Sequence, residues 1–206
     1  MKHFIFLEFL DTRVESTLRE LRDALDPNSK SNSPIHITLR GPYRQEPDPQ
    51  YLRQLSAHLR GQGVRIIGAG LFTTRSGYSV FLRAESSAFR ELWWKPDFQT
   101  PIDKIQPHLT IFESNDKKQA LLALNFLKAS RISILTYSVQ LSIFTTGQGD
   151  LFGTRLVSDE PRAVVENRNI VAIDPEIIPA ARELGVRLAN MVIENITSLP
   201  PTKRDA

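Results

Sequence analysis

Two four-residue segments of one type, histidine-apolar-threonine-apolar, constrain the fold of this chain more than any other feature of its sequence. They are His36-Ile37-Thr38-Leu39 and His108-Leu109-Thr110-Ile111. Because residues i and i+2 of a β-strand point to the same face, each segment would present one imidazole and one hydroxyl side by side. The two apolar residues of each segment would then turn toward a hydrophobic core.

The second segment begins 72 positions after the first, and several other residues recur at the same distance. The matching residues are Phe72-Thr73-Thr74 with Phe144-Thr145-Thr146, Gly77 with Gly149, and Leu52 and Leu55 with Leu124 and Leu127. A shared offset of this kind indicates the internal duplication of a small lobe. Two such lobes, each with a histidine and a threonine, could face each other across one cleft, which suits acid–base chemistry on a phosphate.

The composition excludes several classes of site. The chain has no cysteine, which rules out disulfides, thiolate zinc sites and a cysteine nucleophile. Its four histidines show no metal-ligand spacing, and we expect neither a metal nor a cofactor. The glycine-containing segments 68–70 and 147–149 lack the Gly-Lys-Ser/Thr of a phosphate-binding loop, and no Gly-x-Ser-x-Gly nucleophile motif is present.

The charge and the first residues bear on partners and compartment. A formal net charge of +3 permits an anionic substrate such as a nucleotide or an RNA end, but does not require one. The apolar run 3–10 is interrupted by Glu8 and has no small-residue cleavage site after it, so we expect a strand there and not a signal peptide. No stretch is long enough to span a membrane. Together with the lack of cysteine, this favours a cytoplasmic protein.

The pattern of apolar residues predicts an α+β protein. Strands are expected over about 3–10, 35–40, 64–74, 78–84, 108–112, 133–145 and 151–157, and helices over about 12–25, 48–60, 86–93 and 116–128. This order predicts a bilobal, pseudo-twofold domain over residues 1–158, with antiparallel or mixed sheets that line a central cleft and helices outside. Residues 159–206 would add an extension with one amphipathic helix at about 175–195, packed on the body or on a second subunit. The oligomeric state stays open.

The residues around the two segments carry a family likeness. They are Pro34-Ile35-His36-Ile37-Thr38-Leu39-Arg40-Gly41-Pro42-Tyr43 and Gln106-Pro107-His108-Leu109-Thr110-Ile111-Phe112. Over about residues 1–158 the chain resembles the two-histidine (2H) phosphoesterase superfamily, also called the 2′-5′ RNA ligase-like family, whose signature is one His-x-Thr/Ser motif in each of two lobes. The resemblance implies metal-independent chemistry at a phosphate, often a 2′,3′-cyclic phosphate of an RNA end or a nucleotide, which members open to a 2′-phosphomonoester.

Opening a cyclic phosphate needs one group that accepts a proton from water and one that donates a proton to the leaving oxygen. Histidine can do either near pH 7, so His36 and His108 are the expected general acid and general base. The residues themselves do not decide which histidine has which role, and the family likeness suggests His108 as the base. Thr38 and Thr110 are expected to donate hydrogen bonds to non-bridging phosphate oxygens, although threonine is also common in strands for its β propensity alone.

Three further residues are candidates for substrate binding. Arg40 has the same strand parity as His36 and Thr38, so it could reach the cleft and bind a phosphate, or it could be a surface residue at a strand end. Phe112 stands 72 positions later and could stack on a base or belong to the core. Tyr43 could stack or donate a hydrogen bond, or be an aromatic residue of a turn.

The sequence leaves other activities open. A cyclic oligonucleotide phosphodiesterase, a 2′-5′ phosphodiesterase and an RNA ligase would use the same pair of histidines, and a non-catalytic module would bind a nucleotide without turnover. The remaining histidines, His3 and His58, are expected to be incidental. Trp93-Trp94 is expected to fill the connection between the lobes.

Overall fold

The two strands that begin at the predicted catalytic histidines belong to different sheets. A computed structural model describes residues 1–27, 34–74, 76–92, 106–146, 154–157 and 169–197. Within these residues the chain forms five helices and two sheets, and every strand pairing is antiparallel. The predicted α+β class is therefore confirmed, with antiparallel sheets.

The four-stranded sheet, which we call sheet A, joins the start of the chain to a segment far along it. Its strands, in the order β2-β1-β7-β8, are β1 (Lys2–Phe9), β2 (His36–Tyr43), β7 (Val139–Thr146) and β8 (Thr154–Val157). The central strand β1 pairs with β2 on one side and with β7 on the other. The strand β2, with its histidine at the first position, therefore lies at an edge of the sheet.

The five-stranded sheet, which we call sheet B, has the same pattern at one of its edges. Its strands, in the order β5-β4-β3-β6-β9, are β3 (Val64–Thr74), β4 (Gly77–Glu85), β5 (His108–Ser114), β6 (Ser133–Thr136) and β9 (Ile170–Ala172). The strand β4 pairs with β5 on one side and with β3 on the other. The second histidine thus also begins an edge strand.

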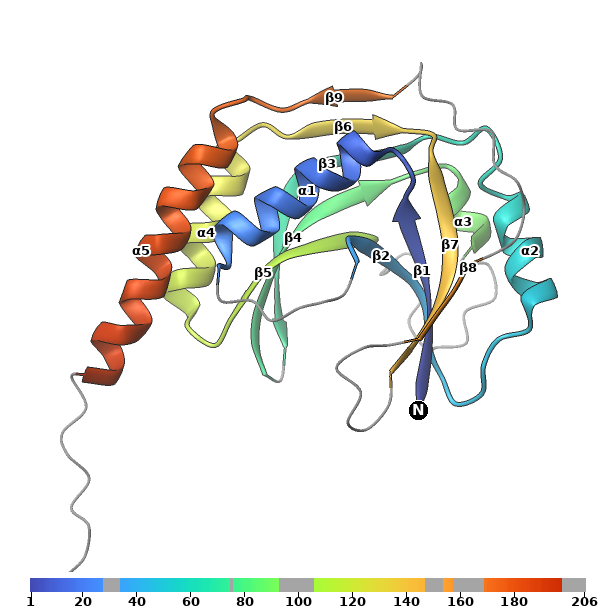
Figure 1. The fold of residues 1–206 in the computed structure, drawn as a ribbon, viewed down its shortest axis with the longest axis horizontal. Helices are drawn as coiled ribbons and strands as arrows, with labels where there is room; N and C mark the ends of the chain where they lie inside the picture. The colour runs from blue at the N-terminus through green and yellow to red at the C-terminus, as the bar shows by residue number, and fades with distance from the viewer. Residues whose placement is uncertain (28–33, 75, 93–105, 147–153, 158–168, 198–206) are drawn as a thin grey trace, which may run out of the picture.

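The helices begin where the sequence supplies caps. They are α1 (Thr12–Leu25), α2 (Pro49–Ala57), α3 (Ala88–Leu92), α4 (Lys117–Ala129) and α5 (Ile177–Thr197). The side chains of Asp11, Asp48 and Asp116 each accept a hydrogen bond from a backbone N–H of the first turn, which satisfies donors that a helix leaves unpaired. Figure 1 shows α4 and α5 at one end of the molecule and α2 at the other.

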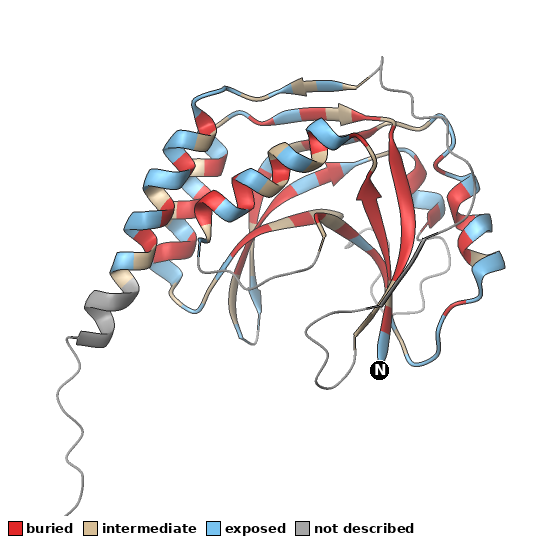
Figure 2. Ribbon diagram, in the orientation of Figure 1, coloured by how far each residue is buried: buried red, intermediate tan, exposed pale blue. Residues whose placement is uncertain are grey.

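One face of the central strands supplies much of the core. Ile5 and Leu7 of β1 are buried in the main hydrophobic cluster, whereas the residues between them face the other side of the sheet. Leu18 and Leu21 of α1 pack into the same cluster. Figure 2 shows buried residues on the sheet strands and on one side of each helix, with exposed residues on the other side. The motif strands are therefore anchored by one face and offer the other face for chemistry.

The C-terminal extension packs on the body of the same chain. Strand β9 pairs with β6, and α5 lies against α1 and α4. Gly185 sits so close to α1 that a Cβ there would lie 2.0 Å from the carbonyl oxygen of Ala24. The predicted helix at 175–195 is confirmed, two residues later at each end. None of the described helices is long and apolar enough to cross a bilayer.

The structure divides one predicted strand and leaves some predicted features untested. The strand expected at 133–145 is two strands, because β6 pairs with β3 in sheet B whereas β7 pairs with β1 in sheet A. The predicted strand over 151–157 is described only from residue 154. The expected turn at 147–149 and Trp93-Trp94 lie outside the described residues.

Candidate functional site

The structure brings the two motif histidines to neighbouring sheet edges. His36 is the first residue of β2 and His108 the first residue of β5, and these two edge strands contact each other (Figure 1). Both imidazoles are half-buried. The charge of a protonated His108 is near enough to lower the pKa of His36. Two segments that are 72 positions apart thus meet at one place.

The same backbone contact orients both imidazoles. His36 Nδ1 lies 2.7 Å from the carbonyl oxygen of Pro34, and His108 Nδ1 lies 2.8 Å from that of Gln106. A carbonyl oxygen can only accept a hydrogen bond, so Nδ1 carries the proton in both rings. In the neutral imidazole the lone pair is therefore on Nε2, which is the atom available for proton transfer.

The motif threonines lie on the same strand face as the histidines. Thr38 is exposed and stands opposite Phe6 of β1, whereas Thr110 is half-buried and stands opposite Phe81 of β4. Because residues i and i+2 share a face, each hydroxyl lies beside the imidazole of its own strand. Each motif strand therefore presents one hydroxyl donor and one Nε2 atom on the same face.

Aromatic rings back both imidazoles. The ring of Phe6 stacks on His36 with centroids 3.7 Å apart and planes 18° apart. The rings of Phe81 and Phe72 contact His108 at 5.0 Å and 4.9 Å, tilted by 57° and 77°. The repeat of Phe72 is visible in the sequence, but a role for these phenylalanines is not, because only the pairing of the strands places them beside the histidines.

Burial sets the protonation of the two histidines. The pKa of His36 is lowered from 6.5 to about 4, mainly by burial; the hydrogen bond to the carbonyl of Pro34 opposes this shift, and the nearby charges of Arg22 and His108 add to it. Burial also lowers the pKa of His108, against a rise caused by the hydrogen bond to Gln106. Both imidazoles are therefore neutral at pH 7, and a bound phosphate would favour the protonated form of either one.

A β-bulge removes Arg40 from the face that carries His36. In the pairing of β1 with β2, Thr38 stands opposite Phe6 but Arg40 stands opposite Ile5, so Leu39 and Arg40 share one partner. Simple alternation had predicted Arg40 beside His36 and Thr38. The extra residue instead places it opposite a core residue, and the side chain is only 3% exposed.

Arg40 is held by helix α2. Its guanidinium donates a hydrogen bond to the hydroxyl of Tyr51 and lies 5.5 Å from the centre of that ring. This geometry joins β2 to α2 and does not support the predicted phosphate contact. Tyr43, the other candidate on β2, is half-buried and packs against the core.

Strand β5 has a bulge at the matching position. Thr110 stands opposite Phe81 and Phe112 opposite Val80, so Ile111 and Phe112 share one partner. Phe112 is 5% exposed and belongs to the hydrophobic cluster. Of the two roles that the sequence left open for Phe112, the structure supports the core role. A bulge is a property of pairing between strands, which explains why alternation along one strand missed both positions.

A buried carboxylate near the motif was not predicted from the sequence. Glu8 stands opposite His36 and accepts hydrogen bonds from Ser142, at 2.5 Å, and from the amide of Gln140, at 3.3 Å. The sequence had shown Glu8 only as a break in an apolar run. The two histidines expected to be incidental lie elsewhere: His3 contacts Thr145 at 2.9 Å, and His58 is the C-cap of α2.

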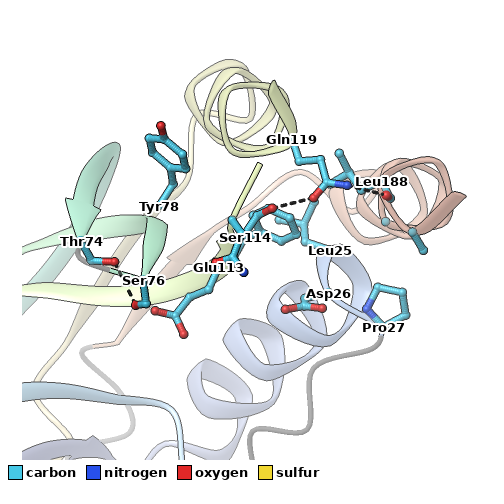
Figure 3. Close-up of a pocket in the computed structure, with 14 residues that line it drawn as sticks. Leu25, Asp26, Pro27, Thr74, Ser76, Tyr78, Glu113, Ser114, Gln119 and Leu188 are labelled. Atoms are coloured by element: carbon cyan, nitrogen blue, oxygen red, sulfur yellow. Dashed lines mark hydrogen bonds between the residues drawn. The ribbon is translucent and has the colours of Figure 1, made fainter. Parts of the chain in front are cut away.

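A cavity of about 550 Å³ lies apart from the histidine pair. Figure 3 shows it between the end of α1, the hairpin of β3 and β4, the end of β5, and helices α4 and α5. Gln119 bridges two of its walls, because it accepts a hydrogen bond from Ser114 and donates one to the carbonyl of Leu188. Phe112 is the one predicted site residue among its described lining, so the cavity is not the space between the motif strands.

Neither metal ligands nor relatives add to this geometry. In the part of the chain that the structure describes, no group of three or more His, Cys, Asp or Glu side chains could hold a metal ion. A comparison with models of known protein families and with curated proteins finds no match for this chain.

Proposed function

We propose that this protein is a phosphodiesterase that needs no metal and opens 2′,3′-cyclic phosphates of RNA ends or nucleotides to 2′-phosphomonoesters. One observation carries the proposal: two histidines at matched positions, each fixed in the same tautomer by a backbone carbonyl, begin edge strands that contact each other. Two Nε2 atoms near one another are what a reaction with two proton transfers requires.

The proposed mechanism uses each part of the site. One imidazole accepts a proton at Nε2 from a water molecule, whose oxygen attacks phosphorus while the bond to O3′ breaks. The other imidazole, protonated on both nitrogens, gives its Nε2 proton to O3′, so that the products are a free 3′-hydroxyl and a 2′-phosphate. Thr38 and Thr110 donate hydrogen bonds to the non-bridging oxygens, on which negative charge grows in the transition state.

Binding of the substrate favours protonation of one imidazole. Burial keeps both histidines neutral at pH 7. The negative charge of a cyclic phosphate favours protonation of one of them, whose proton the solvent supplies as the substrate binds. The reaction then has one neutral and one protonated histidine, and the pH profile of turnover is expected to be a bell.

Matched contacts support a pseudo-twofold duplication as the framework of this site. The carbonyl that holds each histidine, the phenylalanine opposite each threonine and the bulge after each threonine occur in both halves. The matched strands β3 and β7 lie in different sheets, where β3 pairs with β4 and β7 pairs with β1. Each sheet therefore combines strands from both halves of the chain. This arrangement would tie the two lobes together and hold the histidines at a fixed separation.

The test is turnover of a defined substrate panel. Purified protein is incubated with 2′,3′-cyclic mononucleotides and with short RNAs that end in a 2′,3′-cyclic phosphate, with and without a chelator, and the products are resolved as 2′- or 3′-monoesters. We expect a 2′-monoester in both conditions. His36→Ala and His108→Ala should each reduce kcat by roughly 10²–10⁴-fold, the usual value of one general acid or base.

Two results would contradict the proposal. A histidine variant with near wild-type kcat would remove that residue from the mechanism. Binding of the cyclic nucleotide without any product would favour the alternative of a non-catalytic binding module. Cyclic oligonucleotides and 2′-5′-linked dinucleotides in the same panel separate the other activities of this chemistry, which the two histidines would serve equally well.

A further inference from the structure

Each imidazole packs against a stacked pair of phenylalanines, but in a different way: Phe6 lies flat on His36, whereas Phe81 and Phe72 both meet His108 at steeper angles. In sheet A, Phe144 and Phe6 lie 5.0 Å apart at 19°, and Phe6 lies 3.7 Å from His36. In sheet B, Phe72 and Phe81 lie 4.2 Å apart at 23°, and Phe81 lies 5.0 Å from His108. Phe6 is therefore closer to the histidine than to Phe144, whereas Phe81 is closer to Phe72 than to the histidine.

The residue paired with Phe6 across the sheet differs from the residue paired with Phe81. Phe6 pairs with Ser142 of β7, and Phe81 pairs with Gly70 of β3, which is the matching position at an offset of 72. A Cβ at Gly70 would lie 2.4 Å from Cζ of Phe81, so the ring occupies the space that a side chain would need. Ser142 has a fully buried side chain that donates to Glu8, so sheet A carries a side chain at the position where sheet B has none.

We propose that Phe6 and Phe81 are positioning residues for the two histidines, and that the residue paired with each sets how tightly its ring holds the imidazole. Ser142 presses Phe6 onto His36, which fixes the plane of that imidazole and keeps water from one of its faces. Gly70 lets Phe81 lie over β3, so His108 meets Phe81 and Phe72 at an angle and is not held in its plane by a flat ring. The consequence for turnover depends on the proposed function, whereas the consequence for the two imidazoles does not.

Two variants of Ser142 separate the space it fills from the hydrogen bond it makes. Ser142→Ala and Ser142→Gly both remove the hydroxyl that donates to Glu8, but only the glycine opens room for Phe6 to move away from His36. Proton NMR reads the ring directly, because protons above a stacked ring are shifted upfield. Relative to Ser142→Ala, we expect the His36 signals of Ser142→Gly to move downfield and the pKa of His36 to rise toward 6.5.

The catalytic readout uses the same pair. An imidazole that is less well oriented harms the transition state more than ground-state binding, so Ser142→Gly should lower kcat by roughly tenfold to a hundredfold relative to Ser142→Ala, with little change in KM. Gly70→Ser is the reverse change in sheet B: it should move Phe81 toward His108 and shift the His108 signals upfield. If Gly70→Ser fails to fold, the two Ser142 variants still decide.

The outcomes distinguish this inference from the proposed function. Identical His36 signals and pKa values in Ser142→Ala and Ser142→Gly would overturn the inference, even if His36→Ala abolishes turnover. If the wild-type protein opens no cyclic phosphate, the proposed function fails, and the NMR comparison still tests the positioning of the imidazoles. A downfield shift confined to Ser142→Gly supports the inference in either case.

Discussion

The two motif strands are built alike around the histidine and differently beyond it. Each begins with an imidazole held by the carbonyl two residues earlier, and each has a bulge after its threonine. They differ at the residue where the bulge ends: Arg40 bonds to a helix hydroxyl, whereas Phe112 belongs to the core. The parts that are the same in both strands are those to which the proposed function assigns contact with the phosphate, and the parts that differ serve the local packing.

The residues opposite the histidines differ as well. Glu8, a buried carboxylate, stands opposite His36, and Arg83, an exposed guanidinium, stands opposite His108. A duplication with two interchangeable halves would have no reason to place opposite charges at one matched position. The comparison therefore indicates that the two imidazoles lie in different electrostatic environments, which fits the proposed pair of one acid and one base.

The two motif strands differ most at the position where the bulge ends. We expect the largest effect on stability from a substitution there, at Phe112. Phe112→Ala removes a buried ring from the core and should lower the free energy of unfolding by about 3–5 kcal/mol, measured by urea denaturation. Because the ring faces the core, KM for a cyclic nucleotide should stay the same. A raised KM with unchanged stability would show instead that Phe112 stacks on a base.

Arg40 is the matched control for that experiment. Arg40→Met keeps an unbranched side chain but loses the hydrogen bond to Tyr51, so it should cost less stability than Phe112→Ala and leave KM unchanged. A KM that rises only in Arg40→Met would restore the phosphate contact that strand parity had predicted.

Local patterns made the fold class and the motif strands predictable, whereas pairing between strands did not. Apolar spacing along the chain was enough to place the helices and most strands, since both depend on nearby residues, but it missed β9 and the break between β6 and β7. The faces of Arg40 and Phe112 depend on bulges, which form only against a partner strand. The role of Glu8 depends on Ser142 and Gln140, which lie far along the chain, so no local signal could have identified it.

Substitutions of the two threonines test whether the two halves act alike, and we expect the next largest effect from them, on kcat. Thr38→Val and Thr110→Val keep the side-chain shape and remove only the hydroxyl. If each hydroxyl donates to a non-bridging oxygen, each variant should lower kcat by roughly 10²-fold, as loss of one such donor does in other enzymes. Serine at either position should retain most of the activity. A loss at one threonine only would break the proposed equivalence of the two hydroxyls.

The pH dependence of stability gives the smallest effect and compares the two histidines directly. Burial places the pKa of His36 at about 4, whereas the unfolded chain has the ordinary value of 6.5. Between these values the unfolded state binds more protons than the native state, so this histidine makes the free energy of unfolding fall as the pH falls from 6.5 to 4, and has no effect above that window. His36→Gln should flatten this slope in urea denaturation at a series of pH values.

His108→Gln should flatten it too, because burial also lowers the pKa of His108, but less if the looser ring contact leaves that imidazole better hydrated. Equal flattening by both variants would mean that the two imidazoles are buried alike, and that the tighter stack on His36 does not affect its protonation.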